Sequence, residues 1–171
     1  MAEFELETLS AEQALGVRSE VAEVWTGVSA VRLAEILERH ATRDGFTFIA
    51  AREDGRLAGF TYGYRGGPGV WWHDLVWSAL DDAARGRWLA PGHFEYVELH
   101  VRADRRGRGL GGRLHDALLA RQTSSSTAVL STQVDNERAL RLYRSRGWRI
   151  VLPELDFGSG RLFSILGRDL P

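Results

Sequence analysis

The sequence predicts an α/β fold, a mixed sheet of about six to seven strands with helices on both faces. The β-rich runs 45–53 and 56–64 are joined by Asp54-Gly55, and Asp-Gly between two such runs is a strong hairpin signal. Further along, strand-like runs at 94–101 and 126–134 alternate with segments of helical periodicity. We therefore expect an antiparallel first half and a parallel strand pair in the second half.

Periodicity and end signals predict the other elements. Phe4 to Leu9 partly alternate as in a strand, and Ser29 is placed to cap an amphipathic helix that ends near His40. The remaining predictions are helices at 74–87, at 110–122 and from Asp135 to Ser145, and strands at 148–152 and 161–166.

Length and composition predict one globular domain. The 171 residues are 44% hydrophobic and 26% charged, so we expect a single domain over 1–171 with a Trp-rich insert at 70–92 between strands. Cysteine is absent, which excludes disulfides, thiolate nucleophiles, cysteine metal sites and iron–sulfur clusters. The acidic first ten residues and apolar runs of four residues at most predict neither a signal peptide nor a membrane span. We expect a cytoplasmic protein.

Charge is distributed unevenly along the chain. Residues 1–100 contain 9 arginines and 16 acidic residues, whereas residues 101–171 contain 13 arginines and 7 acidic residues. This division favours an anionic ligand in the second half and a cationic one in the first, with drift in surface composition as the alternative.

The strongest local pattern is a Gly- and Arg-rich loop at 101–113, between a predicted strand and a predicted helix. Glycines at 107, 109, 111 and 112 let the backbone approach a ligand, and the helix start offers unpaired N–H groups. Five arginines, at 102, 105, 106, 108 and 113, add mobile positive charge that suits a pyrophosphate. The glycine spacing differs from the dinucleotide fingerprint, and a Walker loop requires a lysine that the chain lacks. The alternative is a connection with solvated arginines.

Two motifs in this half resemble the GNAT superfamily of N-acetyltransferases. Arg106-Gly-Arg-Gly109-Leu-Gly111 matches the family's acetyl-CoA motif, Gln/Arg-x-x-Gly-x-Gly/Ala, position by position. About thirty residues on, Asn136-Glu-Arg-Ala-Leu-Arg-Leu-Tyr143-Arg-Ser-Arg-Gly-Trp148 follows the family's Asn-x-x-Ala-x-x-Leu-Tyr-x-x-x-Gly-Phe pattern, with Trp in place of Phe. The resemblance covers about residues 93–152 and implies a GNAT-like sheet whose parallel strands splay apart at the coenzyme site.

The resemblance also implies an acetyl-CoA site. Backbone groups of Leu99, His100 and Val101 would pair with the pantetheine arm, and Asn136 would contact it or the neighbouring chain. The amides of the loop would hold the pyrophosphate, with the Arg108 and Arg113 side chains assisting. The loop residues concerned are Arg106, Gly107, Arg108, Gly109, Leu110 and Gly111, and less directly Gly112 and Arg113, which match no invariant motif position.

The resemblance implies direct transfer to an amine within a ternary complex. Tyr143 occupies the position of an acid that protonates the departing coenzyme thiolate; the alternative is a ring packed on the sheet. Glu98 or Glu95, on opposite faces of the strand at 94–101, would deprotonate the amine, with Glu98 ranked first because it is nearer the motif. Either glutamate could instead serve structure, and His100 could shuttle a proton or be a bystander.

No metal is predicted, because His73, His93 and His115 show no metal-ligand spacing. The insert could form an aromatic and acidic wall for a cationic amine, from Tyr62, Tyr64, Trp71, Trp72, Asp74, Asp81 and Asp82, or be structural or dimer-forming. The expected partner is a small-molecule or peptide amine, with a homodimer possible and a membrane or nucleic acid disfavoured. A non-catalytic acyl-CoA-binding or protein-interaction module is the main alternative function.

Overall fold

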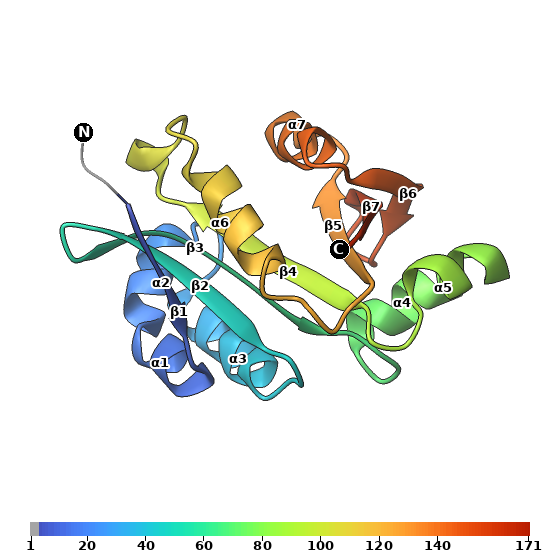
Figure 1. Ribbon diagram of the computed structural model, residues 1–171, viewed down its shortest axis with the longest axis horizontal. Helices are drawn as coiled ribbons and strands as arrows, with labels where there is room; N and C mark the ends of the chain where they lie inside the picture. Colours follow the sequence, from blue (N-terminus) through green and yellow to red (C-terminus); the bar gives the residue numbers. More distant parts are fainter. Residues whose placement is uncertain (1–3) are drawn as a thin grey trace. The chain divides into compact units, whose positions relative to one another are not determined.

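The computed structural model describes residues 4–171 and contains a seven-stranded sheet of order β1-β2-β3-β4-β5-β7-β6 (Figure 1). Pairs β1–β2, β2–β3, β5–β7 and β7–β6 are antiparallel, and β4–β5 is parallel. The expected mixed sheet, with an antiparallel first half and a parallel pair, is confirmed. The chain forms two compact units, which contain residues 4–64 with 97–121 and residues 65–96 with 122–171.

Strand β4 (Phe94–Val101) contributes to both units, and β3 (Arg56–Arg65) lies almost wholly in the first. The first unit also contains β1 (Glu5–Leu9), α1 (Ala11–Gly16), α2 (Arg18–Val24), α3 (Ala30–Ala41), β2 (Thr47–Glu53), the short helix η1 (Ala103–Arg105) and α6 (Leu110–Leu119). The second contains α4 (Trp71–Ala79), α5 (Asp82–Trp88), β5 (Thr127–Gln133), α7 (Glu137–Ser145), β6 (Arg149–Asp156) and β7 (Leu162–Asp169).

The hairpin of β2 and β3 turns at Asp54-Gly55 as predicted. Glu53 is paired with Arg56, and the two turn residues both have positive φ, 51° and 77°. Two successive left-handed residues make a type I′ turn, whose twist matches that of the flanking strands. This turn sets the register of the hairpin and therefore which side chains of β2 face each way.

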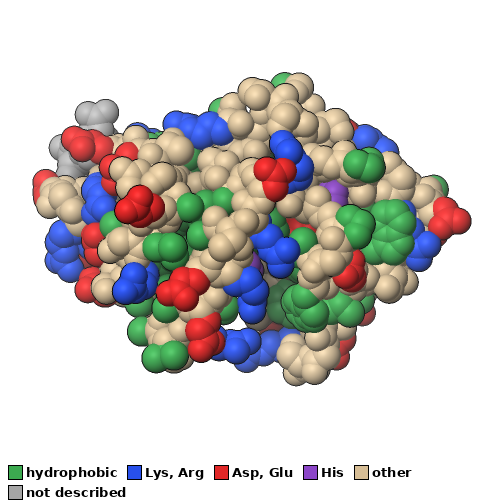
Figure 2. Space-filling model, turned by 90° about the horizontal axis from the view of Figure 1, so that it is seen from below, with side chains coloured by type: hydrophobic (Ala, Val, Ile, Leu, Met, Phe, Trp, Pro, Cys, Tyr) green, Lys and Arg blue, Asp and Glu red, His purple; other side chains and the backbone are tan. Residues whose placement is uncertain are grey.

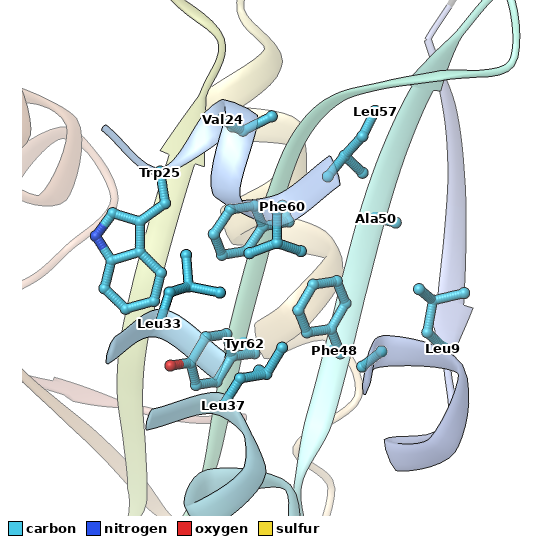
Figure 3. Packing of buried hydrophobic residues seen from close by; sticks show 12 residues of the cluster. Leu9, Val24, Trp25, Leu33, Leu37, Phe48, Ala50, Leu57, Phe60 and Tyr62 are labelled. Atoms are coloured by element: carbon cyan, nitrogen blue, oxygen red, sulfur yellow. The ribbon is translucent and has the colours of Figure 1, made fainter. Parts of the chain in front are cut away.

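The core of the first unit lies between α3 and the β2–β3 hairpin (Figure 3). Ser29 accepts a hydrogen bond from the Arg32 amide and so caps α3 as predicted, and Leu33 and Leu37 of this helix are fully buried. They pack in one cluster with aromatic side chains of the hairpin, namely Phe48, Phe60 and Tyr62. Helices α1 and α2 complete this layer through Ala14, Val21, Val24 and Trp25.

Helix α6 covers the opposite face of the hairpin. A methyl group at Gly59 would come within 3.0 Å of Leu114 of α6 and within 2.8 Å of the His100 carbonyl oxygen. Gly59 precedes Phe60, so its missing side chain belongs on the face away from α3. A residue without Cβ therefore lets α6 and β4 approach β3, and helices lie on both faces of the sheet in this unit.

The insert departs from the single helix expected at 74–87. Leu80 is extended, with ψ 153°, and the Asp81 side chain accepts a hydrogen bond from the Ala84 amide, so the chain forms α4 and α5 instead of one helix. Val76, Leu80 and Leu89 of the insert pack in one cluster with Val129 and Ile165 of the sheet. The insert is therefore part of the second unit's core.

The last two strands are longer than predicted. Strand β6 extends to Asp156, although Pro153 within it lacks an amide donor. It lies at the edge of the sheet, where proline is tolerated, and its register with β7 shifts between Leu152 and Leu155.

Candidate functional site

The predicted anion loop runs from the end of β4 through η1 to α6. Gly107 and Gly109 both have φ 77°, a conformation that favours glycine. Within residues 4–171, helices α1, α3, α5 and α7 begin with a side-chain cap, whereas α2, α4 and α6 do not; α6 begins at Gly109. Arg113 makes the first amide-to-carbonyl bond of the helix, to Gly109 at 3.2 Å. The amides of residues 110–112 precede it, which makes this helix start suitable for an anion.

Each of the five arginines of the loop has a hydrogen-bond partner within the chain. Arg105 and Arg108 both bind the Glu53 carboxylate, Arg108 at 3.0 Å. Arg102 binds Asp104 at 2.7 Å, and Arg106 and Arg113 donate to the carbonyl oxygens of Val101 and Phe4. The Arg113 guanidinium, predicted to assist the pyrophosphate, is thus bonded to the chain just before β1.

Glu53 organises the start of the loop. Its side chain is only 5% exposed, and the hydrogen bond from Arg105 holds the pKa of its carboxyl below the usual 4.5, with Arg108 acting in the same direction against the cost of burial. The two guanidinium groups and one carboxylate leave a net charge of one positive unit. No local sequence signal marks this residue, because the pairing joins positions about fifty apart in the chain.

Asn136 has a structural role in α7. Its side-chain Oδ1 accepts a hydrogen bond from the Ala139 amide at 3.1 Å and so caps the helix. The helix was predicted to begin with a cap at Asp135, one residue earlier. The coenzyme contact implied for Asn136 stays a prediction.

On one face of β4, Glu98 and His100 form a pair. His100 Nε2 lies 2.8 Å from Glu98 Oε2, and the two side chains are 24% and 27% exposed. The imidazole stacks on Trp25, with ring centroids 4.9 Å apart, and on Phe60 at 5.3 Å. Thr61 donates a hydrogen bond to the Glu98 carbonyl oxygen at 2.7 Å. Packing and hydrogen bonds therefore hold both residues while the carboxylate keeps access to solvent.

The tyrosines offered for an aromatic wall are buried instead. Tyr62 is fully buried and Tyr64 is 3% exposed. The Tyr62 hydroxyl lies 3.0 Å from His40 Nδ1, and burial lowers the pKa of His40 to about 4, so this imidazole is neutral at pH 7. Burial, and then the Glu98 charge, raise the pKa of the Tyr62 phenol. These groups act in the core of the first unit.

Acidic residues of the insert have local partners. Asp81 caps α5, Asp82 pairs with Arg85 at 2.9 Å, and Asp74 accepts from the Gly69 amide at 3.2 Å. Trp72 donates from its indole nitrogen to Ser131 at 3.0 Å, while Trp71 is 63% exposed. This arrangement supports the structural alternative for the insert.

Glu95 lies on the other face of β4 from Glu98, as the strand alternation predicts. Its side chain is 4% exposed and its Oε1 is 3.6 Å from His93 Nε2. His93 in turn lies 3.4 Å from His73. The two glutamates proposed as alternative bases are therefore in different environments, one buried beside histidines and one half-exposed.

Tyr143 of α7 packs among aromatic rings of the second unit. Its ring meets Tyr96 and Trp148 edge-on, with centroids 6.1 and 5.7 Å apart, and the residue is 7% exposed. Such edge contacts are favourable and fix the ring plane. The packing that was the structural alternative for this residue is present, and its acid role stays a prediction.

Surface charge and helix length are relevant to two partners that the sequence disfavours, nucleic acid and a membrane. Figure 2 shows basic and acidic side chains interspersed over the face it draws. A nucleic-acid surface usually shows a continuous basic patch instead. In the part of the chain that the structure describes, no helix combines the length and the apolar character that a membrane crossing requires.

Comparisons with known proteins agree with the motifs. Residues 17–148 match the sequence profile described as Acetyltransferase (GNAT) family. The chain is 34% identical over 156 residues to the GCN5-like protein acetyltransferase Rv2170 of Mycobacterium tuberculosis, a match that covers 86% of this chain and 75% of the relative.

Solved structures share the fold. YncA from Salmonella typhimurium, solved with its cofactor acetyl-CoA, has a TM-score of 0.65 at 14% identity, covering 99% of this chain and 95% of that chain. A GNAT-family acetyltransferase from Streptococcus pneumoniae has a TM-score of 0.64 at 13% identity. The match covers 99% of this chain and 100% of the Streptococcus chain.

The ion pairs of Glu53 with Arg105 and Arg108 predict that the stability of the protein depends on pH. Glu53→Gln removes a carboxylate whose pKa is lowered on folding, so the variant should be less stable than the wild type above pH 4.5. The difference should disappear as the pH falls through the lowered pKa, because both proteins are then uncharged at this position. Urea unfolding between pH 3 and 8 measures it. A stability gap that stays constant down to pH 3 would contradict the ion-pair assignment.

Proposed function

Because the chain belongs to the acetyltransferase (GNAT) family and is an acyltransferase, we propose that it moves the acetyl group of acetyl-CoA to a primary amine. The acceptor is a peptide or a small molecule, and the amine attacks the thioester directly in a ternary complex. The observation that carries this proposal is the uncapped start of α6 after two left-handed glycines, within the family's coenzyme motif. The relative's name, a protein acetyltransferase, favours a peptide or protein amine.

The coenzyme pyrophosphate would be held by main-chain amides of the loop and of residues 110–112. Amides at a helix start carry partial positive charge and bind phosphate without a side chain. Arg108, oriented by Glu53, would add its guanidinium, and backbone groups of residues 99–101 would pair with the pantetheine arm. All five loop arginines are hydrogen-bonded within the chain, two of them to Glu53. The backbone would therefore supply most of the binding.

Glu98 is the base in this proposal. A primary amine with a pKa near that of lysine, about 10.4, is protonated at pH 7 and has no lone pair for attack. Glu98, directly or through a water molecule, would take that proton, and His100 would position the carboxylate through their 2.8 Å contact. Glu95 is 3% exposed and lies beside His93, so it is the weaker candidate.

The transfer itself forms a C–N bond and breaks a C–S bond. The freed amine attacks the thioester carbon, and N–H groups of residues 99–101 would stabilise the tetrahedral oxyanion. As the carbon–sulfur bond breaks, Tyr143 would give its proton to the coenzyme thiolate, whose conjugate thiol has a pKa of about 8.5. No acyl-enzyme on sulfur can form, because the chain contains no cysteine.

Charge reversal at the helix start tests coenzyme binding. Gly111→Asp places a carboxylate in the first turn of α6, where acids favour the helix but repel a pyrophosphate. Calorimetry should show acetyl-CoA binding weakened by about tenfold or more, with the melting temperature unchanged or raised. Gly111→Asn, of the same shape without the charge, is the matched control. Equal affinity in the Asp and Asn variants would place the phosphates elsewhere.

Substitution of the proposed base, Glu98, should lower the turnover rate. Glu98→Gln keeps the shape of the side chain and should lower kcat at pH 7 by about 100-fold or more, while acetyl-CoA affinity stays as in the wild type. The loss of kcat should become smaller as the pH approaches the pKa of the acceptor amine, because the amine then loses its proton to the solvent without a protein base. Steady-state kinetics from pH 6 to 10 measure this. A deficit independent of pH would point to a structural role for Glu98.

The acid can be removed without removing the ring. Tyr143→Phe preserves the contacts with Tyr96 and Trp148, so stability and acetyl-CoA binding should be unchanged. Turnover should fall about tenfold to 100-fold, because the thiolate must then leave unprotonated or wait for water. A variant as active as the wild type between pH 6 and 10 would leave Tyr143 with a packing role alone.

A further inference from the structure

Three side chains of the second unit converge beside the start of β4. His73 comes from α4, His93 directly precedes β4, and Glu95 lies two residues further on the same face of the strand. All three are buried, at 2%, 1% and 3% exposure. One nitrogen or oxygen of each lies within 4.8 Å of the others. The two histidines are twenty residues apart in the chain, so their spacing in the sequence does not predict this group.

The hydrogen bond of His93 to the backbone fixes which of its nitrogens faces the group. Its Nδ1 is 3.0 Å from the carbonyl oxygen of Ala90, and a carbonyl can only accept, so Nδ1 carries the proton. Nε2 therefore directs a lone pair toward Glu95 Oε1, 3.6 Å away, which is too far for a hydrogen bond. A cation placed between these two acceptor atoms would bind both of them.

The spacing of the ligand atoms fits a metal ion better than a shared proton. Ligands bound to zinc tetrahedrally at about 2.0–2.1 Å are about 3.3–3.4 Å apart. The separations here are 3.4 Å for His73 Nδ1 to His93 Nε2 and 3.6 Å for His93 Nε2 to Glu95 Oε1. We propose that His73, His93 and Glu95 form a site for a divalent transition-metal ion, with zinc the preferred ion.

The chemistry of the residues agrees with this site. His73 and His93 are both buried imidazoles, and the neutral imidazole is the form that binds metal. The bond from His93 Nδ1–H to a backbone carbonyl is the outer contact that commonly orients a metal-bound histidine. Two imidazoles and one carboxylate are a ligand set that zinc favours, with water in a fourth position.

Gly66 lets the backbone pass close to the group. Its amide donates to the His93 carbonyl oxygen at 3.0 Å, which places its Cα beside the group. A methyl group there would overlap His93 Nε2 and Glu95 Oε1. The neighbouring Gly67 faces open space, with nothing within 4 Å of the corresponding position. A side chain at position 66 would therefore press directly on two of the ligand atoms.

The ion would join α4 to β4 and so fix the insert in the second unit. The proposed acetyl transfer has no step that uses it, so the site can be tested without measuring activity. The untagged full chain is freed of metal with a chelator and titrated with Zn²⁺ by calorimetry, and with Co²⁺ by visible absorption. We expect one ion per chain, a tetrahedral Co²⁺ spectrum and a higher melting temperature with Zn²⁺.

Two variants and a control localise the ion. Glu95→Gln removes a ligand charge, and Gly66→Ala places a methyl group against two of the ligand atoms; each should weaken Zn²⁺ binding by about 100-fold or more. Gly67→Ala should bind as the wild type does. Circular dichroism of each variant without metal separates loss of the ion from loss of the fold. A metal-free wild type that takes up no stoichiometric Zn²⁺ or Co²⁺, or folded variants that bind as the wild type does, would overturn the proposal.

Discussion

The alternation of side chains along β4 is the constraint on which the polar chemistry of this protein depends. Successive residues of a strand face opposite sides, so Glu95 and Glu98 cannot share one environment. The first meets two buried histidines, and the second meets His100 on a surface of aromatic rings. A one-residue shift in the register of β4 would exchange these environments and disrupt both groups.

In the proposed coenzyme site, the backbone contributes more to anion recognition than side-chain charge does. The loop at 101–113 has five arginines, but hydrogen bonds to Glu53, Asp104 and carbonyl oxygens use their guanidinium groups. What the loop offers without competition is the start of α6, where no side chain caps the first amides of the helix. The arginines shape the loop, and the glycines would let the chain approach the phosphates of the proposed coenzyme.

Local signals predicted most of the fold, and contacts between distant residues account for what was missed. The turn at Asp54-Gly55 and the cap at Ser29 depend on neighbours within four residues, and both were predicted correctly. Glu53 with Arg105, and His73 with His93, are joined only by folding, so no spacing rule could find them. The opposite faces of Glu95 and Glu98 follow from strand periodicity and were predictable, whereas their different burial depends on which helices pack on each face.

Tertiary contacts stabilise the two short helices of the insert. Helices of nine and seven residues are marginal by themselves, so α4 and α5 depend on what they pack against. Apolar contacts through Val76 and Leu89 hold one part, and the buried His73 holds another through its contact with His93. A buried group of this kind is stable only when its lone pairs are satisfied, because desolvation of a carboxylate beside unprotonated nitrogen is costly. The absence of cysteine excludes only thiolate ligands. The two histidines and the carboxylate can therefore still bind a shared cation.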